Sequence, residues 1–171
     1  MRTYPYGAPL PQDFGFAMVK PDVVELGISD DVTSRIESAG LCIDRRKLSV
    51  IEPAQVDAIY PDLVTRPFYP AMKESIVGRR ALSLIVVGEH SVSETLMAIK
   101  GSIFDVSGTV RGDYSLAHSL PDEYRELYMA GLLTEAMLLD AGFGHVIRDD
   151  RMHCDENTVE ATQSIKAIFP S

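Results

Sequence analysis

The polar residues best suited to phosphate chemistry stand at the expected ends of secondary-structure elements. Lys20 follows the apolar run 14–19, Arg111 lies between two glycines, and His153 precedes the final helix. A neutral histidine can attack a phosphorus atom, while lysine and arginine can hold phosphate oxygens. Such groups form a phosphate pocket where the loops that carry them converge on one edge of a fold.

Each of these signals also has a plainer structural interpretation. The segment 108–113 could be an ordinary turn closed by an ion pair between Arg111 and Asp113, and composition alone favours that interpretation. A single histidine is more often structural or solvated than catalytic. The charged run 148–156 contains metal-ligand residue types, but its spacing matches no zinc pattern. Taken singly, these residues do not identify a function.

The composition restricts the class of protein and of partner. A chain of 171 residues with 46% hydrophobic residues suits one compact domain. A net charge of −9 and a pI near 4.8 argue against nucleic acid as a partner, because that interaction needs a broad basic face. The two cysteines, Cys42 and Cys154, form no CxxC pair, and no stretch could span a bilayer. We expect a soluble cytoplasmic protein with no membrane partner.

The hydrophobic pattern predicts strands that alternate with helices. Strands are expected at 14–19, 41–51 and 81–87, and helices at 29–40, 53–60, 71–77, 91–100 and 157–169. The uneven connections leave two fold classes open, an α+β sandwich on an antiparallel sheet and a parallel doubly wound sheet. Three prolines among the first eleven residues predict an extended arm over 1–13, ahead of a domain at 14–171.

Five segments, taken in order, resemble the nucleoside diphosphate kinase family. They are Val19-Lys20-Pro21-Asp22, Tyr60-Pro61-Asp62-Leu63, Arg66-Pro67-Phe68-Tyr69-Pro70, Gly108 to Tyr114, and Met152-His153. The resemblance implies an α+β fold, a ferredoxin-like βαββαβ sandwich in which helices pack on a four-stranded antiparallel sheet. It also implies a ping-pong reaction, in which a phosphohistidine at His153 passes a terminal phosphate from a nucleoside triphosphate to a diphosphate.

The resemblance further implies roles in nucleotide binding for five residues. Lys20 would hold phosphate and sugar hydroxyls, Tyr60 would line the site beside the histidine, Phe68 would stack on the base, Arg111 would bind phosphates, and Asp150 stands where the family has a sugar-binding asparagine. The expected partners are nucleotides such as ATP, ADP, GTP and GDP. Magnesium would be held by the phosphates with no direct protein ligand, and Asp62 or Glu156 would reach it through water. A homo-oligomer, at least a dimer, is also expected.

Several positions depart from the family's pattern. The second phosphate-binding arginine, expected within 93–97, is absent, and Lys100 is a candidate substitute. The glutamate that orients the histidine is replaced by Ser164, for which Asp155 could compensate. Arg111 and His153 are 42 positions apart. We therefore predict an insertion at about 116–146, folded as one broken helix or two short ones.

These departures leave three hypotheses for the function. The first is an active nucleoside diphosphate kinase, since His153 and its main companions are present. The second is a catalytically impaired family member that acts as a nucleotide-binding or scaffold protein. The third is a kinase for another phosphorylated metabolite, which requires the inserted helices to cover the cleft as a lid.

Overall fold

The structure, a computed structural model, describes residues 13–89, 91–102, 107–114, 120–143, 146 and 151–170. Most of the predicted N-terminal arm lies outside these residues. Asp150, one of the predicted nucleotide-binding residues, also lies outside them.

Four strands form one antiparallel sheet. They are β1 (Phe14–Val19), β2 (Cys42–Val50), β3 (Arg80–Val87) and β4 (Met152–Cys154). Their order is β2-β3-β1-β4, and each neighbouring pair is antiparallel. The predicted α+β sandwich is thereby confirmed, and the parallel doubly wound alternative is excluded. The long apolar run of β1 has a simple cause, because this strand lies between two others and is covered on both faces.

The helices lie on the connections between the strands and after the last strand. They are α1 (Pro21–Glu25), α2 (Ser29–Ser38), α3 (Pro53–Ile59), the short 3-10 helix η1 (Pro61–Leu63), α4 (Tyr69–Ile76), α5 (Val92–Lys100), α6 (Val110–Tyr114), α7 (Asp122–Met129), α8 (Glu135–Asp140) and α10 (Thr158–Ile168). All five helices predicted from the hydrophobic pattern are present. No helix in the described ranges is long and apolar enough to cross a membrane.

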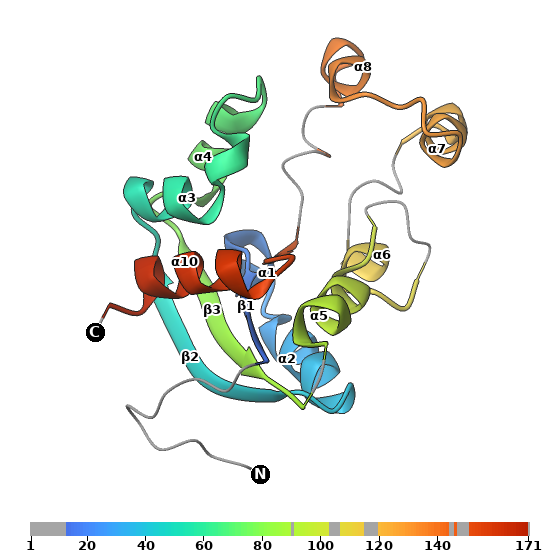
Figure 1. The fold of residues 1–171 in the computed structure, drawn as a ribbon. Coiled ribbons are helices and arrows are strands. Elements are labelled where there is room, and N and C mark those ends of the chain that lie inside the picture. The colour runs from blue at the N-terminus through green and yellow to red at the C-terminus, as the bar shows by residue number, and fades with distance from the viewer. Residues whose placement is uncertain are drawn as a thin grey trace.

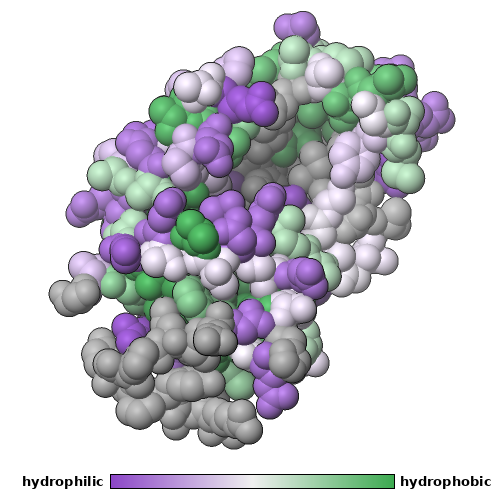
Figure 2. Space-filling view, viewed as in Figure 1, coloured by the Kyte–Doolittle hydropathy of each residue, from purple (hydrophilic) through white to green (hydrophobic). Residues whose placement is uncertain are grey.

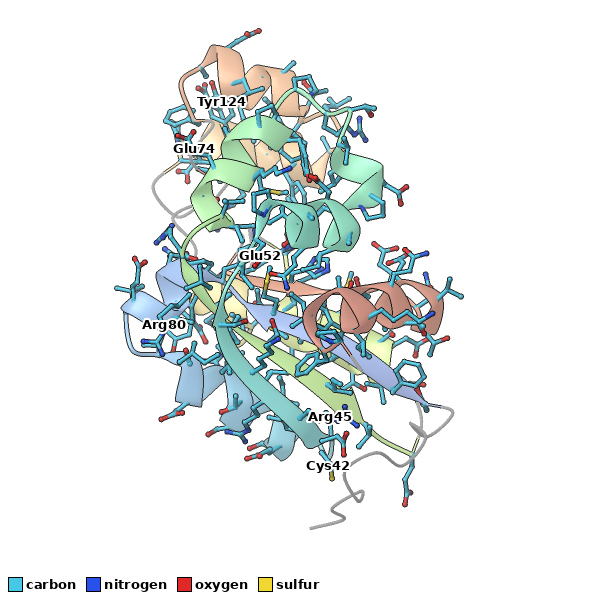
Figure 3. The ribbon with its side chains drawn as sticks, turned by 90° about the vertical axis from the view of Figure 1, so that its left-hand side faces the viewer. Cys42, Arg45, Glu52, Glu74, Arg80 and Tyr124 are labelled. Carbon is cyan, nitrogen blue, oxygen red and sulfur yellow. The ribbon has the colours of Figure 1, made fainter. Side chains whose placement is uncertain are left out.

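The two faces of the sheet support two hydrophobic cores. Phe16 and Met18 of β1 point toward α3, α4 and α10, whereas Ala17 and Val19 point toward α2 and α5. This alternation follows from the two-residue period of a strand. The side view shows α10 on one side of the sheet and α2 on the other (Figure 3). Each side chain of β1 or β4 therefore points into one of two separate layers, one on each face of the sheet.

The helices α7 and α8 stand apart from the sheet, beyond α5 and α6 (Figure 1). They have a small hydrophobic cluster of their own, built on Leu120, Leu138 and Val146. The chain turns after α7 at Gly131, whose φ of +70° is a left-handed conformation that glycine adopts without strain. Within residues 120–143, the structure has two short helices, α7 and α8, in place of one continuous helix.

Gly15 brings β1 unusually close to α5. A Cβ atom at this position would lie 2.9 Å from Cδ1 of Leu96 and 3.1 Å from Cγ1 of Val92. Both side chains are fully buried, so neither can move freely. The absence of a side chain at Gly15 therefore allows the helix to pack directly on the strand that leads to Lys20.

We predict that Gly15→Ala lowers the free energy of unfolding by about 1–2 kcal/mol, because the added methyl group overpacks the β1–α5 contact. Urea unfolding followed by circular dichroism measures this. In a Leu96→Ala background the same substitution should cost much less, because the truncated side chain leaves room for the methyl group. Equal losses in the two backgrounds would contradict the proposed clash.

Candidate functional site

His153 is the central residue of β4 and faces the layer that contains α3 and α10. Its strand neighbours, Met152 and Cys154, belong to the core under α2 and α5, so the imidazole lies on the opposite face. Its ring centroid is 4.5 Å from that of Tyr60 and 6.3 Å from that of Phe16. With 14% of its side chain exposed, His153 is packed on most sides and still accessible to a small ligand.

Asp155 is the hydrogen-bond partner of the His153 ring. Its Oδ1 lies 2.9 Å from Nε2 of the histidine. An ionised carboxylate can only accept a hydrogen bond, which assigns the ring proton to Nε2. Nδ1 makes no hydrogen bond with any residue that the structure describes. The lone pair of Nδ1 is therefore available to attack an electrophile.

Lys20 and Tyr60 lie together on the same side of the sheet. Lys20 lies between β1 and α1 as the N-terminal cap of that helix, and its backbone N–H donates to the carbonyl of Arg151, 3.1 Å away. Its side chain is nearly fully buried, with Nζ 5.8 Å from the centroid of the Tyr60 ring. The structure thus brings together three of the predicted site residues, Lys20, Tyr60 and His153.

Tyr60 is positioned by the pair of helices α3 and α4. It is the C-terminal cap of α3. Asp57 on that helix accepts hydrogen bonds from Tyr69 (2.6 Å) and Lys73 (2.5 Å) on α4. Burial raises the pKa of the Tyr69 phenol well above its usual range, and the hydrogen bond to the carboxylate adds to this shift. Tyr69 therefore stays neutral and keeps its proton in this contact at physiological pH.

Phe68 lies at the start of α4, in the same hydrophobic cluster as Tyr60. Its side chain is buried, with 7% exposed. The ring helps to hold α4 against the core, and its predicted stacking on a nucleotide base stays a prediction.

Arg111 lies on α6, where the sequence indicated a glycine turn. Its Nη1 donates to the backbone carbonyl of Gly101 at the end of α5, with a separation of 3.1 Å. The preceding Gly108 has a φ of +87°, which allows the chain to turn into the helix. The structure therefore places the Arg111 guanidinium beside the end of α5.

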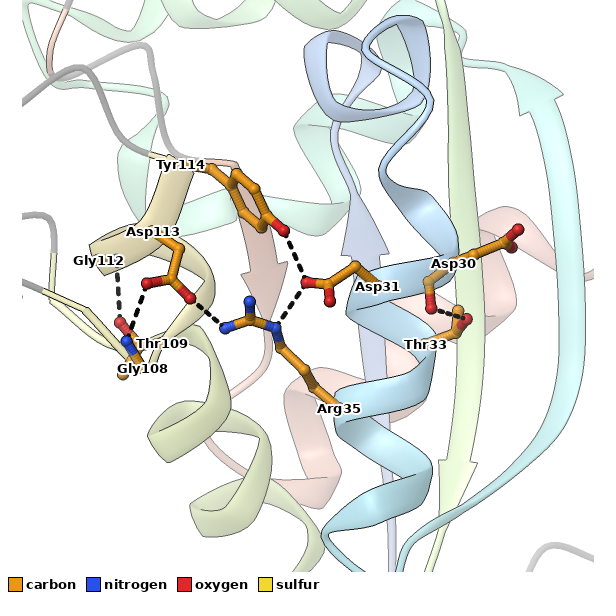
Figure 4. A network of polar contacts seen from close by, with 9 residues as sticks. All are labelled: Asp30, Asp31, Thr33, Arg35, Gly108, Thr109, Gly112, Asp113 and Tyr114. Carbon is orange, nitrogen blue, oxygen red and sulfur yellow. Dashed lines mark hydrogen bonds and ion pairs between the residues drawn. The ribbon is translucent and has the colours of Figure 1, made fainter.

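An ion-pair network holds α6 against α2 (Figure 4). Arg35 on α2 lies 2.6 Å from Asp31 and 2.6 Å from Asp113, and Tyr114 donates to Asp31 over 2.9 Å. Burial lowers the pKa of Arg35, but the hydrogen bonds to the two carboxylates outweigh it and raise this pKa above its ordinary value. The network fixes the helix that carries Arg111.

Arg151 is a site residue that the sequence did not identify. Its guanidinium forms an ion pair with Asp22 on α1, and its Nε donates to the carbonyl of Tyr114 on α6, 2.7 Å away. Only 8% of the Arg151 side chain is exposed. The residue therefore joins β4, α1 and α6 two positions before His153. The only signal for Arg151 in the sequence was the position of this charged residue, two residues before His153.

The other predicted site residues are dispersed. Asp62 on η1 and Glu156 after β4 are both exposed, while Lys100 at the end of α5 and Ser164 on α10 are buried. Among the described residues, no group of three or more His, Cys, Asp or Glu side chains is placed to hold a metal ion.

The surface is hollowed between the side formed by α3 and α4 and the side formed by α7 and α8 (Figure 2).

Comparison with known proteins identifies the family. The sequence profile described as nucleoside diphosphate kinase matches residues 14–120, which is more than half of the chain. A nucleoside diphosphate kinase of Methanosarcina mazei is 36% identical over 104 residues, which cover 59% of this chain and 69% of that protein. The chain therefore belongs to the nucleoside diphosphate kinase family. His153 and Asp155 lie beyond the segment that the profile matches.

Solved structures show the same fold over most of the chain. The apo nucleoside diphosphate kinase of Encephalitozoon cuniculi superimposes with a TM-score of 0.70 at 21% identity, covering 94% of this chain and 90% of that one. The enzyme of Borrelia burgdorferi, solved as a transition-state mimic with vanadate and ADP, gives 0.71 at 22% identity, covering 92% and 87%. The fold similarity therefore extends beyond residue 120 to β4 and α10.

We predict that Arg151→Met lowers the free energy of unfolding by about 2–3 kcal/mol, because it leaves Asp22 without its partner and removes a contact between β4 and α6. Chemical denaturation measures the loss. The matched control is Arg46→Met, which breaks the exposed ion pair with Glu37 and should cost less than about 1 kcal/mol. Similar losses in the two variants would show that Arg151 has no special role in anchoring β4.

Proposed function

We propose that this protein is an active nucleoside diphosphate kinase, which moves the terminal phosphate of a nucleoside triphosphate to a nucleoside diphosphate through a phosphohistidine at His153. The proposal rests on the hydrogen bonding and the exposure of the His153 imidazole. Its Nε2 is held by Asp155, its Nδ1 makes no hydrogen bond to the described residues, and its ring is partly exposed beside Tyr60. Membership of the family supports the same reaction.

The reaction has two balanced steps. The Nδ1 lone pair attacks the terminal phosphorus of the triphosphate, an N–P bond forms, and the bond to the bridging oxygen breaks with its electron pair leaving on the diphosphate. In the second step a terminal oxygen of the acceptor diphosphate attacks the same phosphorus, and the N–P bond returns its electrons to Nδ1. Nε2 keeps its proton throughout, donated to Asp155. The histidine is thus regenerated without an added base.

Cationic side chains would offset the negative charge of the phosphoryl group during its transfer. Lys20 is nearly fully buried on the same side as Tyr60, where its ammonium group is weakly screened by water. Arg111 lies on a helix fixed by the Arg35 network, so its guanidinium has a stable base from which to reach phosphate oxygens. The two residues would hold the phosphates, and Phe68 and Asp150 would contact the nucleoside.

Magnesium fits this site as a companion of the nucleotide. The exposed carboxylates of Asp62 and Glu156 suit contacts through water better than direct coordination. The ion supplies charge neutralisation on the phosphates, while the residues of this chain orient the histidine and the nucleotide.

A homo-oligomer, at least a dimer, is part of the proposal. The strand β2 lies at one edge of the sheet, and it exposes Leu48 and Val50 on its surface, with 45% and 54% accessible. Exposed apolar residues on an edge strand favour association with another chain.

The test is transfer of label from γ-labelled ATP with magnesium. We expect an acid-labile label on the wild-type protein, no label on His153→Ala, and movement of the label to GDP when that nucleotide is added. His90→Ala is the matched control, because it removes one of the other three histidines of the sequence and should keep the label. Calorimetric or thermal-shift titration with ADP measures nucleotide binding separately.

The two measurements separate the competing functions. Absence of label on a protein that ADP still stabilises would replace the kinase with the nucleotide-binding or scaffold function. Label that moves to a phosphorylated metabolite and not to GDP would indicate a different acceptor and a role for α7 and α8 as a lid.

A further inference from the structure

We propose that Asp155 is the positioning residue of the active site, which fixes the orientation and the tautomer of His153 from the same strand segment. This inference rests on the proposed function and adds a residue to it. The carboxylate contacts Nε2, the ring nitrogen that does not attack phosphorus in the proposed reaction, so its role is exerted through the ring.

Backbone geometry holds Asp155 in place. Its N–H donates to the carbonyl of Phe16 over 3.3 Å, which continues the pairing of β4 with β1 by one residue. Residues two apart on an extended segment point to the same face. Asp155 therefore lies beside His153 because of the strand itself, and only 2% of its side chain is exposed.

The burial of this carboxylate is difficult to explain by stability alone. Of its two oxygens, Oδ1 contacts the imidazole, and Oδ2 has no hydrogen-bond partner in the described part of the chain. A buried and incompletely satisfied carboxylate costs free energy unless its environment compensates for it. Such a cost at a residue whose one side-chain hydrogen bond is to the proposed nucleophile points to a functional role.

The last helix offers no competing partner. Ser164 on α10 is 1% exposed, and its hydroxyl makes no hydrogen bond with His153 among the described residues. Serine also lacks the charge that would stabilise a positive imidazole. The orienting carboxylate is therefore supplied by the segment that follows β4.

The contact has two consequences for phosphoryl transfer. It holds the proton on Nε2, which leaves the lone pair on Nδ1 for attack. It also stabilises the positive charge that develops on the ring as the N–P bond forms. Partners that orient metal-binding histidines are typically worth about 10- to 100-fold in activity, and we expect a loss of similar size for a partner that orients this nucleophile.

The test compares Asp155→Asn with the wild type and with Glu74→Gln. Asparagine keeps the size of the side chain but loses the charge, and its amide can either donate or accept, so it does not impose one tautomer. Glu74 is an exposed carboxylate on α4 (Figure 3), and its substitution removes one negative charge away from the histidine. Circular dichroism and thermal unfolding check that each variant is folded.

Two readouts are needed. Nitrogen NMR of the imidazole should show Nε2–H with an unprotonated Nδ1 in the wild type and in Glu74→Gln, and a mixture of tautomers in Asp155→Asn. The single-turnover rate of phosphorylation should fall about 10- to 100-fold in Asp155→Asn, with ADP affinity unchanged. An unchanged rate or an unchanged tautomer in that variant overturns the proposal.

The design also distinguishes failure of the function from failure of the positioning role. If the wild type takes no label, the proposed kinase function fails, and the tautomer measurement alone then decides whether Asp155 orients the ring. If the wild type takes label and a folded Asp155→Asn takes it equally fast, the kinase function stands and the positioning role is rejected.

Discussion

The central position of β1 is the constraint on which the site depends. This strand pairs with β3 on one side and with β4 on the other, and both of its faces are covered. Lys20 follows its last residue, and His153 pairs with Met18 near the same end of the strand. A slip of one residue in the β1–β4 register would turn the imidazole into the opposite core. The pairing of buried strands thus determines which residues can meet a ligand.

Charge is used in this protein mainly to fix the positions of other groups. The chain is strongly acidic, yet several of its cations are anchored by carboxylates near the site. Arg151 binds Asp22, and Arg35 binds Asp31 and Asp113. Contacts of this kind are directional, so they specify how β4 and α6 sit relative to the helices that precede them. The acidic composition is therefore compatible with a locally cationic phosphate site.

The elements that could be predicted from the sequence are those with a strong period or a clear boundary. The strands predicted at 14–19 and 81–87 are β1 and β3, and the helix predicted at 157–169 is α10. That helix begins after Asn157, whose side chain accepts from two backbone N–H groups. The missed elements are short. The helix α1 has five residues and β4 has three, too few to show a period. Proline at the first position of α1 was the available signal.

The candidate site was predictable to a similar extent. Lys20, Tyr60 and His153 were named from their motifs, and the fold brings them together. The contact of Arg111 with Gly101 joins α6 to the end of α5, and the anchoring role of Arg151 arises between segments distant in sequence. No local pattern carries the role of Arg151, because it depends on how the residue before β4 contacts α1 and α6.

In the proposed arrangement, the nucleophile and the group that orients it belong to one extended segment. His153 and Asp155 are two residues apart, so their separation is set by the local backbone and by pairing with β1. An orienting residue on α10 would depend instead on how that helix packs against the sheet. Here the buried face of α10 presents Ser164 between apolar residues that pack on the core. The orientation of His153 therefore does not depend on how the last helix packs. The inner face of α10 contributes to the hydrophobic core instead.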